Sequence, residues 1–227
     1  MNGVPLDTDG RHRVEAAAAP ATAWRNGGGV TRELLRLPAA RTDASDAWDL
    51  RISLADVEHD GPFSAYPGIQ RWIAVVAGAG MRLEDAGATR PIELRPGAAP
   101  LRFDGAWAPQ CVLLDGPIRD LNVMAREGAR RAVLQAAAWH SPWSPAGMGA
   151  NPARGVFVRQ AARLVGSGGA IERLPAFTLA FWELSDITAW TLLPEGGSPE
   201  PRGQTDAAQA PPGWWIACTC AIPEEDA

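Results

Sequence analysis

The sequence of 227 residues contains no lysine, because all 21 of its basic residues are arginine. Schiff-base chemistry and the lysine of a phosphate-binding P-loop are therefore excluded. Histidine is also scarce, and His12, His59 and His140 show no spacing typical of metal ligands. We expect these histidines on the surface or in loops, and we expect neither a metal ion nor a cofactor.

Cysteine and long apolar runs are sparse as well. Cys111, Cys218 and Cys220 are odd in number and form no C-x-x-C pair, which indicates free thiols in a reducing compartment. No apolar run approaches the roughly 18 residues that span a bilayer, and residues 1–20 contain no signal-peptide core. We therefore expect a cytoplasmic protein that does not enter a membrane.

The charge and the turn-forming residues narrow the class further. The formal net charge is −5 and the arginines form no cluster, so we expect a small-molecule or protein partner and no nucleic acid. The 24 glycines and 20 prolines are costly inside helices and favour many short strands joined by turns. An all-β sandwich or barrel is the expected fold class.

Strands are predicted wherever apolar or alternating segments lie between turn residues. The predicted segments are residues 31–37, 48–57, 70–77, 110–114, 155–164, 177–184, 187–193 and 214–222. Residues 126–139 are rich in alanine and arginine, so propensity alone is compatible with a helix there, and the segment stays undecided.

Two predicted strands carry polar residues on one face only. Along residues 48–54, Asp49, Arg51 and Ser53 lie opposite a row of Trp48, Leu50, Ile52 and Leu54. In residues 120–124, Asp120, Asn122 and Met124 share a face opposite Leu121 and Val123. The polar faces either meet solvent or line a cavity, and in a cavity an arginine with an asparagine and an aspartate would suit a carboxylate or amide ligand.

Two loops are further candidates for a binding site. Residues 60–68 contain Phe63, Ser64 and Tyr66 between prolines, a stiff loop that either gates a pocket or plugs one end of a barrel. Residues 24–31 hold three consecutive glycines, which could approach an anion or simply enter a hairpin. The chain has no G-x-S-x-G motif and no identified base for a cysteine nucleophile, so no catalytic residue is assigned.

Three blocks, residues 24–33, 48–71 and 115–126, resemble the HutD/Ves family. The resemblance implies a bicupin with two RmlC-like jelly-roll barrels, at residues 15–130 and 131–223, and a link to histidine utilisation without an established reaction. Metal-dependent cupins use two histidines and a glutamate in one motif and a third histidine in another, which this chain lacks. The chain also has Leu121 where the family tends to have an aromatic residue and Glu127 where it has a second arginine.

The family motif and the residue patterns agree on part of a ligand site. Both select Arg51, Ser53, Phe63, Ser64, Asp120 and Asn122. The resemblance alone adds Trp24, Asn26, Arg32, Glu33, Arg71 and Met124.

Three functions are compatible with these residues. The first is a metal-free, non-catalytic protein that binds a small carboxylate metabolite, plausibly of histidine utilisation, with Arg51 on the carboxylate and Tyr66 or Trp72 beside Phe63 as apolar walls. The second is a metal-independent isomerase or lyase with Asp120 or Glu33 as general base. The third is a protein-interaction module with a large apolar surface patch. The resemblance also makes a homodimer plausible.

Overall fold

All regular elements in the described part of the chain are β-strands. The computed structural model describes residues 11–39, 47–85, 90–145, 147–148, 152–166, 169–183, 188–196 and 210–220, in which there are eighteen strands and no helix. Over these residues the all-β prediction is confirmed. Accordingly, no helix among them is long and apolar enough to cross a membrane.

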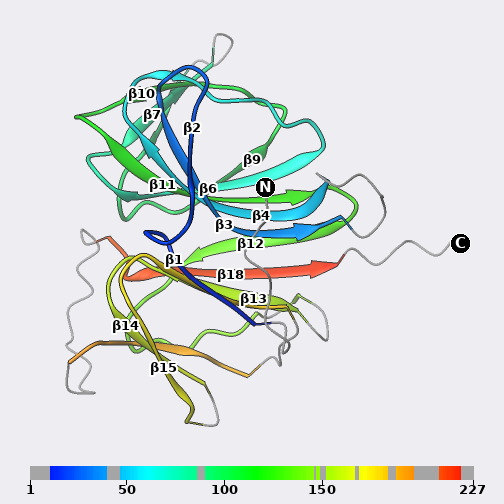
Figure 1. Cartoon of the computed structure of the whole chain (residues 1–227), viewed down its shortest axis with the longest axis vertical. Coiled ribbons are helices and arrows are strands. Elements are labelled where there is room, and N and C mark those ends of the chain that lie inside the picture. The colour runs from blue at the N-terminus through cyan, green and yellow to red at the C-terminus, as the bar shows by residue number, and fades with distance from the viewer. Residues whose placement is uncertain are drawn as a thin grey trace, which may run out of the picture.

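Two sheets form the N-terminal half of the molecule (Figure 1). The larger sheet has the strand order β2 (Ala21–Ala23), β3 (Gly29–Pro38), β4 (Trp48–Val57), β11 (Ile118–Arg126), β6 (Ile69–Ala77) and β9 (Leu101–Asp104). The smaller sheet has the order β5 (Gly61–Pro62), β10 (Gln110–Leu113), β7 (Met81–Glu84) and β8 (Ile92–Leu94). All pairings are antiparallel.

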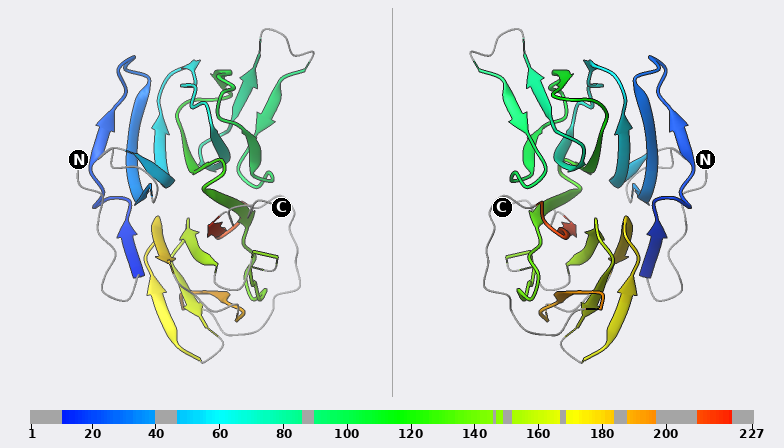
Figure 2. Two further views of the ribbon diagram at one scale, coloured as in Figure 1. Left: turned by 90° about the vertical axis from the view of Figure 1, so that its right-hand side faces the viewer. Right: turned by 90° about the vertical axis from the view of Figure 1, so that its left-hand side faces the viewer.

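Two further sheets form the C-terminal half. The larger one has the order β1 (Arg11–Glu15), β16 (Thr178–Trp182), β13 (Ala153–Val158), β18 (Gly213–Cys220) and β12 (Arg130–Ala136). The smaller one has the order β15 (Ile171–Leu174), β14 (Ala162–Val165) and β17 (Thr191–Pro194). Strand β1 is the exception to chain order, because it lies beside β16 in this half, as both views of Figure 2 show.

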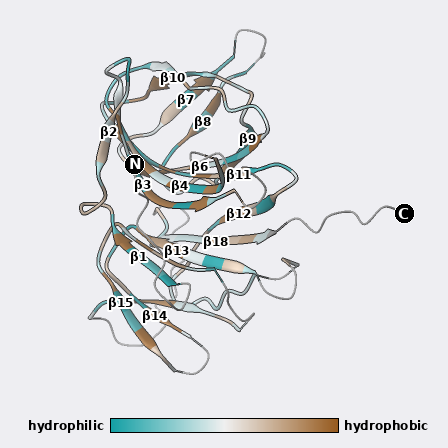
Figure 3. Ribbon diagram, turned by 45° about the vertical axis from the view of Figure 1, so that its right-hand side comes forward, coloured by the Kyte–Doolittle hydropathy of each residue, from teal (hydrophilic) through white to brown (hydrophobic). Residues whose placement is uncertain are grey.

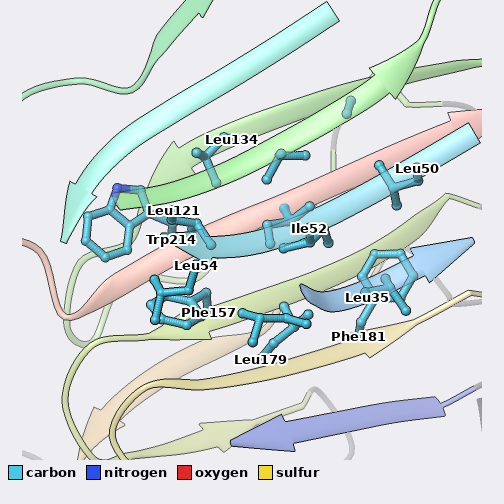
Figure 4. Close-up of a cluster of buried hydrophobic side chains, with 14 of the residues drawn as sticks. Leu35, Leu50, Ile52, Leu54, Leu121, Leu134, Phe157, Leu179, Phe181 and Trp214 are labelled. Carbon is cyan, nitrogen blue, oxygen red and sulfur yellow. The ribbon is translucent and has the colours of Figure 1, made fainter. Parts of the chain in front are cut away.

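The two larger sheets pack against each other and share a core. Apolar residues follow the strands of both halves (Figure 3). Leu50, Ile52 and Leu54 of β4 lie in this core with Phe157, Phe181 and Trp214 of the other half, and all six side chains are at most 1% exposed (Figure 4). Separate clusters of buried residues fill each half between its larger and smaller sheet. Each larger sheet is therefore covered on both faces.

The predicted strands agree best with the structure in the N-terminal half. Strand β4 has the predicted bounds, and β3, β6 and β10 differ from them by one or two residues. Residues 155–164 form parts of two strands, β13 and β14, because residues 159–160 form a bend. Positions 184, 187 and 221–222 of the predicted strands lie outside the described residues. The division of the chain at residues 15–130 and 131–223 stays a prediction.

Candidate functional site

The inner face of the larger N-terminal sheet carries the predicted polar residues in two neighbouring rows. Cross-strand pairing places Met124 of β11 between Arg51 of β4 and Arg71 of β6. The next row has Asn122 between Ser53 and Ile73. Because neighbouring strands are about 4.8 Å apart, the backbones of Arg51 and Arg71 are separated by roughly 10 Å.

This polar face is buried. Ser53, Asp120 and Asn122 are 3%, 1% and 7% exposed, while the residues between them on each strand belong to the core shared by the two halves. The alternation predicted for residues 48–54 and 120–124 is thus confirmed, and the polar side chains point into the N-terminal half instead of into solvent. A buried polar side chain needs a hydrogen-bond partner, so each must be accounted for.

A chain of hydrogen bonds links Arg71, Asn122 and Asp120. The Nη2 of Arg71 donates to the Oδ1 of Asn122 at 2.9 Å, and the Nδ2 of Asn122 donates to the Oδ1 of Asp120. The Nη1 of Arg71 also donates to the backbone oxygen of Ser64 at 3.3 Å. The Nε of Arg71 is buried and has no hydrogen-bond partner.

Three aromatic rings surround the guanidinium of Arg71. Its central carbon lies 5.3 Å from the ring centre of Phe63, 5.6 Å from that of Tyr66 and 4.9 Å from that of Phe103. Aromatic faces attract cations, and they also exclude water from the side chain. The arginine is consequently held in a fixed position with only 6% of its surface exposed.

The charge of Arg71 has no directly paired carboxylate. No acidic group of the described residues lies within ion-pair distance of it. The charge of Asp120, which is linked to Arg71 by hydrogen bonds through Asn122, favours the ionised form of Arg71. Burial lowers the pKa of Arg71. Burial also raises the pKa of Asp120 to about 7, although the charge of Arg71 and the hydrogen bond from Asn122 oppose this shift.

Arg51, in contrast, is paired with Glu33 of β3. Its Nε donates to the Oε2 of Glu33 at 2.9 Å, and Arg36 binds both oxygens of the same carboxylate at 2.9 and 2.8 Å. Burial by itself would raise the pKa of Glu33, but the hydrogen bonds and charges of Arg36 and Arg51 outweigh it and the pKa lies below its ordinary value. These contacts orient Arg51 through its Nε.

The remaining predicted residues divide into two groups. The loop residue Phe63 contacts Arg71, whereas Ser64 contributes its backbone oxygen and its side chain is exposed. Trp24 and Asn26 lie in the β2–β3 turn, where Trp24 donates to the Oγ1 of Thr31 at 2.7 Å and the Oδ1 of Asn26 accepts from the amide of Gly28 at 3.0 Å. Their hydrogen bonds are thus made within this turn, and Trp24 also packs against the buried cluster of the N-terminal half.

The site also includes residues that the sequence did not single out. Phe103 of β9 packs on Arg71, and Arg36 completes the ion pairs of Glu33. The alternation of apolar and polar residues in Leu101, Arg102, Phe103 and Asp104 is the signal that could have revealed β9. Four residues are too few to establish the two-residue period of a strand. The expectation of exposed or loop histidines is wrong for His12, which lies in β1 and is 2% exposed.

A hollow of about 210 Å³ lies next to this arrangement. It is lined by Gln70, Arg102, Phe103, Asp104 and Glu127. Gln70, Arg102 and Asp104 alternate with Arg71 and Phe103 along β6 and β9, so most of the lining of the hollow lies on the face of the sheet opposite Arg71. In the described part of the chain, no group of three or more His, Cys, Asp or Glu side chains could hold a metal ion.

Comparison with known proteins identifies the family of this chain. The model of the HutD family matches residues 16–196. The chain belongs to the HutD family. The resemblance found in the sequence motifs is thereby confirmed for most of the chain.

Relatives in Pseudomonas and in enterobacteria resemble part of this HutD-family chain. An uncharacterized 21.2 kDa protein encoded in the hutC 3' region of Pseudomonas putida is 41% identical over 123 residues, which cover 54% of this chain and 62% of the relative. Protein Ves of Citrobacter koseri is 32% identical over 120 residues, covering 52% of this chain and 59% of the relative. The chain thus spans about three fifths of the length of the curated relatives it matches.

Solved structures extend the similarity to nearly the whole HutD-family chain. A conserved protein of unknown function from Pseudomonas aeruginosa has a TM-score of 0.71 and 28% identity, covering 93% of this chain and 99% of the other. HutD from Pseudomonas fluorescens also has a TM-score of 0.71, with 24% identity and coverage of 92% and 98%. An oxalate decarboxylase from Bacillus subtilis has a TM-score of 0.54 at 8% identity, with coverage of 92% and 76%, so the fold is cupin-like.

Proposed function

We propose that this HutD-family protein binds a small carboxylate metabolite on the inner face of its N-terminal half, without catalysing a reaction and without a metal. The observation that carries the proposal is the buried guanidinium of Arg71, which has an unpartnered Nε and no carboxylate within ion-pair distance. A buried cation without a paired anion is unfavourable, and an anionic ligand would relieve that cost.

The neighbouring side chains supply complementary contacts for such a ligand. Arg51 is held through its Nε, so its terminal nitrogens are available to a second oxygen atom. Ser53 and Asn122 offer neutral hydrogen bonds, and Phe63 and Phe103 offer apolar walls.

The fold and the names of related proteins suggest where this ligand comes from. We propose that each half is a cupin-type barrel, because each pairs a larger with a smaller antiparallel sheet around its own buried cluster. The relative from Pseudomonas putida is described by its position in the hutC 3' region, and the Pseudomonas fluorescens neighbour is called HutD. We therefore propose metabolites of histidine utilisation as the first ligands to test. A homodimer stays a prediction.

The test is a thermal-shift and calorimetric titration against urocanate, formiminoglutamate, formylglutamate, glutamate and histidine. A ligand that binds only the native state raises the melting temperature by mass action. We expect Arg71→Lys, which loses the planar fork, and Arg51→Ala to weaken binding to a measurable but much lower affinity and so to reduce the shift. Arg82→Ala, a change to a half-exposed arginine of β7 outside the site, is the matched control and should bind like the parent. Equal binding by all three variants, or no shift with any compound, would contradict the proposal.

A second candidate function is favoured by one observation, the pKa of about 7 for Asp120. A general acid or base works best when its pKa lies near the working pH, so a metal-independent isomerase or lyase would use Asp120. Glu33 is unsuited to this role because Arg36 and Arg51 hold it ionised. NMR of each bound compound over a day separates the two functions: an unchanged ligand supports binding alone, whereas turnover that Asp120→Asn removes without loss of affinity would establish an enzyme.

A further inference from the structure

The strand β3 contains an irregularity next to the proposed ligand site. Its pairing with β4 runs from Gly29 opposite Val57 to Glu33 opposite Ser53, and resumes with Leu35 opposite Ile52. Leu34 is the extra residue and has no register partner on β4 or β2. Leu34 and Leu35 are both buried in the core shared by the two halves, which is the pattern of a β-bulge.

This bulge decides which side chains reach the inner face. If the register before the bulge continued, Leu35 would lie opposite Arg51 and Arg36 would lie opposite Leu50, within the core between the halves. With the bulge, Arg36 lies opposite Arg51 and shares an inner face with Glu33. Only this arrangement allows Glu33 to bind Arg36 and Arg51 together, and thereby to orient Arg51.

A histidine from the other half of the molecule binds the bulge. The Nε2 of His12 lies 2.6 Å from the backbone oxygen of Leu34, and because a carbonyl oxygen only accepts, the imidazole donates. His12 is located in β1, which pairs with β16 of the C-terminal half, and its side chain is 2% exposed. The contact is therefore a fixed, buried hydrogen bond between the two halves at the residue adjacent to Glu33.

We propose that His12 is a positioning residue of the ligand site: its hydrogen bond to Leu34 holds the bulge that sets Glu33 and Arg36 on the inner face, and so fixes the direction of Arg51. This inference rests on the proposed function for its effect on binding. The C-terminal half, through β1, thus acts on a site to which it contributes no other side chain in the described network. His12 itself does not touch the ligand.

The first experiment reads the position of Arg51 without any ligand. In ¹⁵N NMR spectra, the Nε–H of an arginine held by a carboxylate exchanges slowly with water and gives a sharp signal. We expect His12→Ala to speed exchange of the Arg51 Nε–H by about tenfold or more, the scale that a loss of about 1.4 kcal/mol corresponds to. His12→Gln, whose side-chain amide can still donate, should preserve the slow exchange, and His59→Ala, a change to an exposed loop histidine, should have no effect.

The second experiment measures urocanate affinity in a double-mutant cycle. We expect His12→Ala to weaken binding by about fivefold, to have little further effect in an Arg51→Ala background and to retain its full effect in an Arg71→Lys background. A general loss of stability would lower affinity equally in both backgrounds. The proposed function fails if neither urocanate nor any of the other four compounds binds the parent. The role of His12 fails if Arg51 Nε–H exchange in folded His12→Ala matches that of the parent. It also fails if His12→Ala changes urocanate affinity by the same factor in the Arg51→Ala and Arg71→Lys backgrounds.

Discussion

Arg71 and Arg51 illustrate how two arginines on one face come to have different roles. Arg51 already has a carboxylate partner, Glu33, and this pair costs little because it is partly exposed. Arg71 is buried among three aromatic rings, and its hydrogen bonds go to a neutral amide and a backbone oxygen. Among the described residues, Asp120 is the carboxylate whose charge favours the ionised form of Arg71, and the charge of Arg71 in turn acts to lower the pKa of Asp120.

The first prediction concerns the pH dependence that Asp120 imposes on stability. Its pKa is about 7 in the folded chain and 3.8 in its ordinary state, so between these values the native state binds more protons than the unfolded state. The free energy of unfolding must therefore fall as the pH rises through this window, by up to about 1.4 kcal/mol per pH unit. Urea denaturation from pH 5 to pH 8 should show this decline, and Asp120→Asn should flatten it.

Two comparisons isolate the contribution of Asp120. Glu33 has a lowered pKa, so its stabilising effect is lost only as the pH falls below about 4.5, outside the measured window. Asp115→Asn changes an exposed aspartate and should keep the slope of the parent. A parent profile that is flat, or that rises with pH and is unaltered by Asp120→Asn, would show that Asp120 is ionised in the native state.

At the scale of elements, the close approach of β3 to β4 depends on a glycine. A Cβ atom added at Gly29 would lie 2.2 Å from the backbone oxygen of Asp56, a distance at which one of the two strands must move. We expect Gly29→Ala to reduce the free energy of unfolding by at least about 2 kcal/mol, measured by urea denaturation. At the adjacent Gly28, the added atom would meet only the side chain of Asn26 at 3.3 Å, so Gly28→Ala should cost much less. Equal losses would exclude the clash as the cause.

Strand β12 shows why propensity could not settle residues 126–139. Their alanine content permits a helix, yet Arg130–Ala136 pair with β18 over seven residues. The Nε1 of Trp72 also donates to the backbone oxygen of Ala132 at 2.9 Å, which joins β6 of one half to β12 of the other. Partners this distant in the sequence leave no local signal, and tertiary pairing overrides the preference of alanine.

The hydrogen bond of Trp72 leads to a prediction at the same scale. Trp72→Phe keeps an aromatic ring in the shared core but leaves the Ala132 oxygen without this donor, so the free energy of unfolding should fall by about 1–3 kcal/mol. Trp107→Phe removes a similar bond, to Asp85 at 3.1 Å, at an exposed position where water can replace it. Calorimetric melting of both variants tests this, and it is contradicted if Trp107→Phe is the more destabilising.

The same contrast between local and distant signals explains how much of the site the sequence predicted. Alternation within one strand correctly placed Ser53, Asp120 and Asn122 on a face opposite the core, because that pattern depends only on the backbone period. The sequence could not indicate that Phe103 packs on Arg71 or that His12 binds Leu34, since strands far apart in the chain bring them together. The bulge at Leu34 was hidden for the same reason, because two adjacent leucines resemble any apolar strand.

At the scale of the whole molecule, the two halves are coupled through their shared core. The C-terminal sheet covers the outer face of the N-terminal sheet, and β1, although it precedes the N-terminal sheet in the chain, pairs with β16 of the C-terminal half. Figure 4 shows Ile52 and Leu54 lying among Phe157, Leu179 and Trp214 of the other half. Truncation of a side chain in this shared core should therefore destabilise both larger sheets. Truncation of a side chain in the cluster inside one half should destabilise mainly that half.

Two isoleucines test this coupling because both are 0% exposed but lie on opposite faces of the N-terminal sheet. Ile52 belongs to the core shared by the halves, and Ile73 to the cluster inside the N-terminal half. Either change to alanine should cost about 2–5 kcal/mol. In native-state hydrogen exchange, we expect Ile52→Ala to speed amide exchange in β4 and in β18 by similar factors, and Ile73→Ala to speed it in β6 and β11 far more than in β18. If Ile52→Ala left exchange in β18 unchanged, the halves would open independently.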